Sequence, residues 1–93
     1  MAGLLQRIRQ KVIDRDYYLS SHAEEEMRED DLERSDVENA LLKGKIDKRL
    51  TRDPRGTRYR IEGPAHDGRV IQVVCRLDEE ESLRIITIYA LER

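Results

Sequence analysis

The chain has 93 residues, which is the size of one domain with a modest core, and we predict a single domain over residues 1–93. Charged residues make up 41% of the chain, but the net charge is −2, which argues against a protein that coats nucleic acid through overall positive charge. The chain has one cysteine, no signal-peptide pattern and no apolar run of membrane-spanning length, so we expect a soluble cytoplasmic protein in a reducing compartment, without membrane contact.

Helical periodicity begins close to the N-terminus. Apolar residues at helical spacing predict an amphipathic helix over about residues 2–14. The apolar segment 17–19 that follows is extended, and its pattern fits either a short strand or a linker. The sequence contains neither Trp nor Phe, so Leu, Ile and Val, helped by tyrosine rings, must form the core.

His22 lies at the start of a second predicted helix. Ser21 and Glu24 have the spacing of a capping box, which predicts a helix from Ser21 to about residue 30. The positive end of the helix dipole disfavours a cation in this first turn, so we expect a neutral imidazole that can accept a proton. The alternative is that His22 only begins the helix and packs its ring on a neighbour.

The second half of the chain predicts a sheet. A capping box at Ser35 and Glu38 predicts a third helix, which Gly44 is suited to end as a C′ residue. Alternating and β-branched segments then predict a basic edge strand, a second strand, a central strand and a last strand: 45–51, 57–62, 69–77 and 83–91. The order predicts an α+β fold, with N-terminal helices packed on one face of a twisted antiparallel sheet of about four strands.

Residues 45–60 form a locally basic stretch in an acidic protein. This stretch contains seven Lys and Arg residues but only two Asp residues. Such a local concentration of positive charge can bind a phosphate backbone. Lys48 and Arg49 are the phosphate-binding candidates on the predicted edge strand. The alternative is a charged edge strand that prevents one sheet from pairing with another.

Alternation with a period of two sorts the strand residues into two faces. The row of odd-numbered residues in 71–77 and the row of Ile86, Ile88 and Ala90 are apolar, so we expect both under the helices. The opposite, open face then carries guanidiniums, an amide and two hydroxyls, from Arg58, Arg60, Arg76, Gln72, Thr87 and Tyr89. Arginine forks suit phosphate oxygens, although a half-exposed sheet face that is merely polar fits the same pattern.

These residue types match one reaction in particular. Cleavage of RNA by its own 2′-OH needs a proton acceptor, a cation for the pentavalent phosphate and a proton donor for the leaving oxygen. His22 or Tyr89 can transfer protons, and Arg58, Arg60 or Arg76 can stabilise the charge. The two histidines and the cysteine lack the spacing of a metal site, so neither a metal nor another cofactor is expected.

Four short motifs follow one another in a fixed order: Tyr18-x-Ser20-x-His22-Ala23, then Gly56, Arg58, Tyr59 and Ile61, then Arg69-Val70-Ile71-x-Val73-Val74, and finally Ile86-Thr87-x-Tyr89. Over residues 17–91 this order resembles an uncharacterised family, domain of unknown function 4258. That family is similar in fold to the RelE/ParE toxin superfamily, which includes ribosome-dependent mRNA endonucleases and gyrase poisons encoded beside an antitoxin. The resemblance implies four catalytic candidates: His22, Arg58, Thr87 and Tyr89.

The resemblance and the open face together predict a toxin-like, RNA-directed module of a toxin–antitoxin system. Its expected activity is that of a metal-independent endoribonuclease similar to the mRNA interferases, with a cognate antitoxin and RNA or the ribosome as partners. The expected phosphate-binding residues are Arg60, Arg76, Gln72, Lys48 and Arg49. The alternatives are a non-catalytic binding module of the same fold that acts through protein partners, and a structural protein that pairs at the 45–51 edge.

Overall fold

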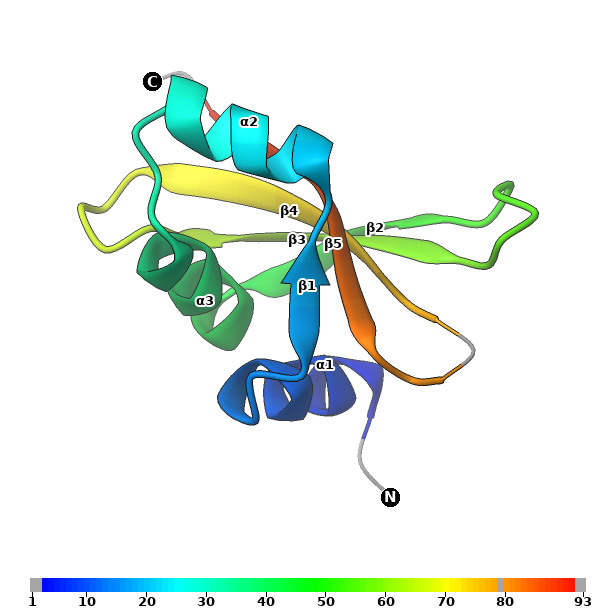
Figure 1. Ribbon diagram of the computed structural model, residues 1–93. Coiled ribbons are helices and arrows are strands. Elements are labelled where there is room, and N and C mark those ends of the chain that lie inside the picture. Colours follow the sequence, from blue (N-terminus) through cyan, green and yellow to red (C-terminus); the bar gives the residue numbers. More distant parts are fainter. Residues whose placement is uncertain (1–2, 79, 92–93) are drawn as a thin grey trace.

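The computed structural model describes residues 3–78 and 80–91 (Figure 1). In chain order its elements are α1 (Leu4–Ile13), β1 (Tyr17–Leu19), α2 (Ser21–Glu29), α3 (Arg34–Lys43), β2 (Lys45–Leu50), β3 (Arg58–Pro64), β4 (Val70–Leu77) and β5 (Leu83–Ala90). The predicted α+β class is confirmed, with the helices in the N-terminal half and packed against the sheet. Among the described residues, no helix is long and apolar enough to cross a membrane.

Within the described residues, five strands form one sheet in the order β1-β5-β4-β3-β2. Strands β2 to β5 are an antiparallel meander, as predicted, but β1 pairs in parallel with β5 from Tyr17↔Leu83 to Leu19↔Ile85. The expectation of about four antiparallel strands is therefore corrected to a five-stranded mixed sheet. Three residues are too few to show the alternation that predicts a strand. The segment becomes the strand β1 because the edge of β5 is free to pair with it.

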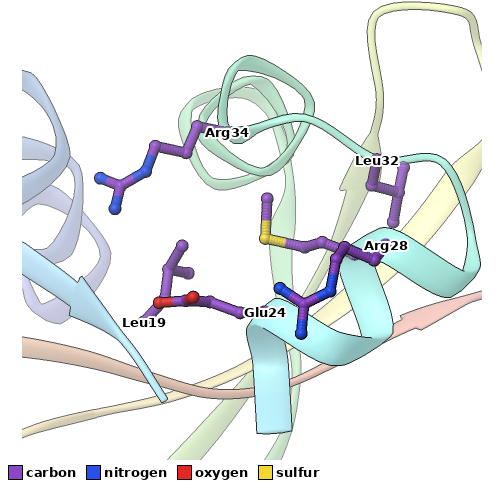
Figure 2. A pocket seen from close by; sticks show the side chains of 6 residues that line it. Leu19, Glu24, Arg28, Leu32 and Arg34 are labelled. Carbon is purple, nitrogen blue, oxygen red and sulfur yellow. The ribbon is translucent and has the colours of Figure 1, made fainter. Parts of the chain in front are cut away.

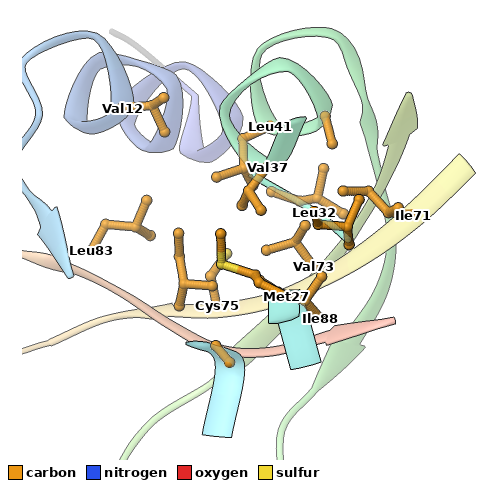
Figure 3. Packing of buried hydrophobic residues seen from close by; sticks show 14 of the residues in the cluster. Val12, Met27, Leu32, Val37, Leu41, Ile71, Val73, Cys75, Leu83 and Ile88 are labelled. Atoms are coloured by element: carbon orange, nitrogen blue, oxygen red, sulfur yellow. The ribbon is translucent and has the colours of Figure 1, made fainter. Parts of the chain in front are cut away.

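The helices cover one face and one edge of the sheet (Figure 1). Helix α3 packs on β3 and β4, α1 packs on α3, and α2 lies against β5. The core between them is aliphatic, as the composition requires, and its fully buried members include Ile8, Leu41, Ile61, Ile71, Leu83, Ile85 and Ile88 (Figure 3). The other face of the strands carries most of the polar residues that the sequence singled out.

Two glycines let the end of α3 approach the sheet very closely. Gly44 has a φ of −85°, so it is not the left-handed C′ residue that the sequence predicted. A Cβ on Gly44 would lie 2.4 Å from the carbonyl oxygen of Glu62, and a Cβ on Gly63 would lie 2.3 Å from that of Ala40. Glycine is needed at both positions because backbone packs directly on backbone.

The N-caps of α2 and α3 both lie earlier in the chain than predicted, and of these two helices α3 alone has a capping box. The N-cap of α2 is Ser20, not Ser21, and its Oγ accepts a hydrogen bond from the Ala23 N–H at 3.0 Å. Ser20 takes this position because its Oγ also donates to the carbonyl of Ile86 at 2.7 Å, where β1 ends against β5. His22 nevertheless lies in the first turn of the helix, as expected.

The N-terminus of α3 is capped around Asp36 instead of Ser35 and Glu38. The Oδ2 of Asp36 accepts from the Glu33 N–H at 2.9 Å, and its Oδ1 accepts from the His66 N–H at 2.9 Å. Asp36 is only 9% exposed. One buried carboxylate therefore caps the helix and also holds the loop between β3 and β4.

Replacing Asp36 with alanine should lower the free energy of unfolding by about 2 kcal/mol, because a cap is lost and a second N–H loses its acceptor. Urea denaturation followed by circular dichroism measures this change. Ser35→Ala is the matched control and should change the stability by less than about 0.5 kcal/mol, since Ser35 is exposed and is not the cap. An equal loss in both variants would contradict the observed cap.

Candidate functional site

A β-bulge in β5 decides which of its side chains reach the open face. The register between β4 and β5 shifts between Val74 and Cys75, which leaves Ile86 as the extra residue. Ile85 is consequently fully buried, whereas Ile86 lines a hollow on the opposite face. The prediction that Ile86 packs under the helices is therefore wrong, and the same shift brings Arg84 to the open face.

Four arginines surround a hollow of about 180 Å³ on this face, which we call the arginine pocket. Arg76 and Arg84 are cross-strand partners on β4 and β5, and Arg58 begins β3. The whole lining is Ser20, Asp53, Arg55, Arg58, Arg76, Arg84 and Ile86. The structure thus brings the predicted Arg58 and Arg76 together and adds two arginines, Arg55 and Arg84, that the sequence did not single out.

The pocket has more hydrogen-bond donors than acceptors. The carboxylate of Asp53, whose side chain is 7% exposed, lies 3.4 Å from the Arg58 Nε and 3.6 Å from the Arg76 Nη1. These distances are those of ion pairs, and the buried Nε atoms of Arg58 and Arg84 have no hydrogen-bond partner among the described residues. Buried donors normally find an acceptor, so this arrangement favours an added oxyanion.

Asp53 carries its negative charge at neutral pH. The backbone N–H of Arg55 donates to its Oδ1 at 2.9 Å. This hydrogen bond, together with the Arg55 and Arg58 guanidiniums, lowers the pKa of the Asp53 carboxyl. The pocket therefore sets four guanidiniums against one carboxylate.

Arg84 is fixed at the wall of the pocket by Tyr18 on β1. Its Nη2 donates to the Tyr18 hydroxyl at 2.8 Å, and its guanidinium lies 4.7 Å from the centre of the Tyr18 ring. The Tyr18 hydroxyl in turn donates to Oδ2 of Asp78 at 2.8 Å. Strand β1, which had a linker as its alternative reading, therefore helps to build the site.

Two of the predicted phosphate ligands lie on the open face but already bind carboxylates. Arg60 donates to both oxygens of Asp47, at 3.0 and 2.9 Å, and these hydrogen bonds raise the pKa of Arg60 and lower that of Asp47. Gln72 donates to Glu62 at 3.0 Å. Both side chains lie outside the residues that line the arginine pocket.

Lys48 and Arg49 are separated by the pleat of the edge strand. Lys48 pairs with Arg60 on the open face, whereas Arg49 pairs with Tyr59 and lies 5.8 Å from the centre of its ring. Both still line a groove of about 380 Å³ along β2, which Arg58 also lines. Arg58 therefore connects the groove of the edge strand with the arginine pocket.

His22 lies at the edge of β5, on the surface of the molecule. Its side chain is 64% exposed, and its Nε2 is 3.4 Å from the Oε1 of Glu26. The same oxygen accepts a hydrogen bond of 2.9 Å from the N–H of Ile88, the residue between Thr87 and Tyr89 in the sequence. His22 therefore lies beside the stretch of β5 that carries Thr87 and Tyr89, and the structure adds Glu26, which the i,i+4 spacing from His22 could have indicated.

The group formed by His22, Glu26 and the Ile88 N–H lies next to the arginine pocket along β5. Ser20 lines the pocket and caps α2 two residues before His22. Ile86 also lines the pocket and directly precedes Thr87 at the edge. In the described part of the protein no hydrogen bond joins the two groups. A bound polymer would therefore have to be long enough to contact both.

Two other features lie outside this region. A hollow of about 240 Å³ between α2 and α3 has Met27 and Leu32 in its apolar lining and Arg28 and Arg34 at its sides (Figure 2). It contains none of the predicted site residues. Cys75 is fully buried, and burial raises the pKa of its thiol to about 12, so the thiol stays protonated and is not a nucleophile.

The architecture defines a small α+β protein whose helices cover one face of a mixed sheet and whose other face holds a basic pocket. The chain matches the family model "Domain of unknown function (DUF4258)" over residues 19–90, and it therefore belongs to that family. Comparison with curated proteins and with solved structures gave no match.

Proposed function

We propose that this protein is a toxin-like, RNA-directed module that binds RNA phosphate in the arginine pocket and cleaves the chain without a metal. This activity is that of an mRNA interferase, and it agrees with the resemblance of the family to the RelE/ParE superfamily. The observation that carries the proposal is the shortage of acceptors in the arginine pocket, where the buried Nε atoms of Arg58 and Arg84 have no hydrogen-bond partner among the described residues and Arg76 has only an ion pair of 3.6 Å with Asp53. Guanidiniums form charge-assisted hydrogen bonds with phosphate oxygens, and a phosphate would supply the missing acceptors.

The proposed reaction is attack of the RNA 2′-oxygen on the adjacent phosphorus. His22 accepts the 2′-OH proton, a new O–P bond forms, and the bond to the 5′-oxygen breaks as Tyr89 donates a proton to it. The products are a 2′,3′-cyclic phosphate and a 5′-hydroxyl end. Glu26 lies at ion-pair distance from His22 and can orient its ring. The Thr87 hydroxyl can interact with the oxygens of the phosphate that is cleaved, while Arg58 binds a neighbouring phosphate of the same RNA chain in the arginine pocket.

The experiment incubates the purified protein with single-stranded RNA, with and without ribosomes, and measures both binding and cleavage. Arg76→Met should weaken RNA binding about tenfold to a hundredfold, since hydrogen bonds to a charged group contribute about 1.5–3 kcal/mol. Arg34→Met removes the same charge from the exposed start of α3 and is the matched control. Unchanged RNA binding by Arg76→Met would contradict the proposed phosphate site.

The second candidate function is a non-catalytic module of the same fold that acts through protein partners. The observation in its favour is the outer edge of β2, where no strand of the described residues pairs. Such an edge can accept a strand from another protein. Expression of the protein alone distinguishes the two, because a nuclease toxin should arrest growth, whereas a binding module should accumulate without arrest.

A further inference from the structure

Asp53 enters the arginine pocket from the loop between β2 and β3, residues 51–57. Its side chain is slightly more buried than that of Arg76, with 7% exposed against 10%. Among the described residues it is the one carboxylate in the lining of the pocket, where it faces Arg55, Arg58 and Arg76. A negatively charged group of the chain itself therefore lies where the donors of the pocket converge.

The hydrogen bonds of Asp53 belong to its own loop. Its Oδ1 accepts from the Arg55 N–H, and its carbonyl accepts from the Gly56 N–H at 3.0 Å. Toward the strands, the described contacts of the carboxylate are the ion pairs of 3.4 and 3.6 Å with Arg58 and Arg76. Within the described part of the chain, the tip of the loop can consequently move as a unit without breaking a hydrogen bond to the sheet.

We propose that Asp53 occupies the phosphate site when RNA is absent, and that a phosphate group binds by displacing its carboxylate. This inference rests on the phosphate site of the proposed function and adds a residue that determines its specificity. Inorganic phosphate and phosphate monoesters have more unesterified oxygens and more negative charge than a carboxylate, so the exchange satisfies more of the guanidinium donors. A simple carboxylate ligand offers no such gain and should not displace Asp53.

The test uses Asp53→Asn, which keeps the shape of the side chain and removes its charge. Titration calorimetry with inorganic phosphate, and then with a short single-stranded oligoribonucleotide, should show binding at least tenfold tighter than for the wild-type protein. Glu29→Gln makes the same change of net charge at an exposed position of α2 and should alter the affinity less than threefold. Asp53→Glu keeps the charge and should bind phosphate about as the wild type does.

Thermal unfolding gives a second measurement. Without phosphate, Asp53→Asn should melt below the wild type, since the guanidiniums lose their counter-charge, and added phosphate should raise its midpoint more than that of the wild type. In the wild-type protein, the amide NMR signals of Asp53, Arg55 and Gly56 should shift when phosphate is added, which tests displacement without any substitution.

The outcomes separate the inference from the proposed function. Equal or weaker phosphate binding by Asp53→Asn would overturn the inference, because Asp53 would then support the ligand or lie apart from it. If wild-type protein cleaves RNA and Asp53→Asn gains no affinity, only the inference fails. If Asp53→Asn gains phosphate affinity and no RNA is cleaved, the inference stands and the proposed cleavage fails.

Discussion

Replacing His22 with alanine is expected to slow RNA cleavage by about 10²- to 10⁴-fold, the usual contribution of a positioned acid or base. His22 lies in the first turn of α2, with its ring exposed and its Nε2 3.4 Å from a carboxylate oxygen of Glu26. That oxygen is itself held by the Ile88 N–H. The rate should be measured under single-turnover conditions, so that it reports the chemical step and not the release of product.

His66→Ala is the matched control, since it removes the other histidine of the chain. His66 is exposed in the loop between β3 and β4, where its backbone N–H donates to Asp36, and no contact of its side chain with Thr87, Tyr89 or Glu26 is seen among the described residues. This variant should cleave RNA at the wild-type rate and bind it equally well. Cleavage at the wild-type rate by His22→Ala would remove His22 from the mechanism, and binding alone would then be left for this edge.

Replacing Gly63 with alanine is expected to destabilise the protein by about 3 kcal/mol, the upper part of the range for overpacking a rigid site. The new Cβ would lie 2.3 Å from the carbonyl oxygen of Ala40 and 2.9 Å from the Cα of Gly44. Both are backbone atoms, so α3 would have to move away from β3. Differential scanning calorimetry should show a midpoint more than about 10 °C lower.

Gly3→Ala controls for the general effect of adding a methyl group to a glycine. A Cβ on Gly3 would meet nothing within 4 Å, and this residue precedes α1 at the surface. The midpoint should therefore stay within about 3 °C of the wild type, as for other surface changes. A Gly63→Ala variant as stable as Gly3→Ala would show that α3 and β3 do not pack as closely as the structure indicates.

The face of the sheet that carries the arginine pocket was predictable from the alternation along β3 and β4. The full set of residues that line the pocket was not. Arg58 and Arg76 follow from that alternation, and both line the pocket. Strict alternation through β5 would have put Arg84 in the apolar row, where an unpaired charge is costly. That conflict indicates a bulge near Ile86. The bulge also explains why the prediction that Ile86 packs under the helices was wrong.

Asp53 and Arg55 gave no comparable signal. Both lie in a turn that the sequence marks by Asp-Pro-Arg-Gly, and a turn motif gives the shape of a loop but not the surface on which it lies. The loop reaches Arg76, 21 or more positions further along the chain, because Tyr59 of β3 pairs with Cys75 of β4, which sets the end of the loop beside Arg76. Contacts of this kind depend on how strands pair, which no local pattern records.

The sequence by itself determined the α+β class, the three helices, the order of the meander and the aliphatic core, because periodicity and caps are local properties that act within a few residues. Only the tertiary structure decided the parallel pairing of β1, the positions of the N-caps of α2 and α3, the role of Gly44 and the arginine pocket. Each of these depends on groups that meet across the sheet: the free edge of β5, a carbonyl of β3 against α3, and a carboxylate carried by a loop to arginines on other strands. The twist of the sheet and the register of its strands determine which of these groups come into contact, and a one-residue bulge is enough to change the contacts.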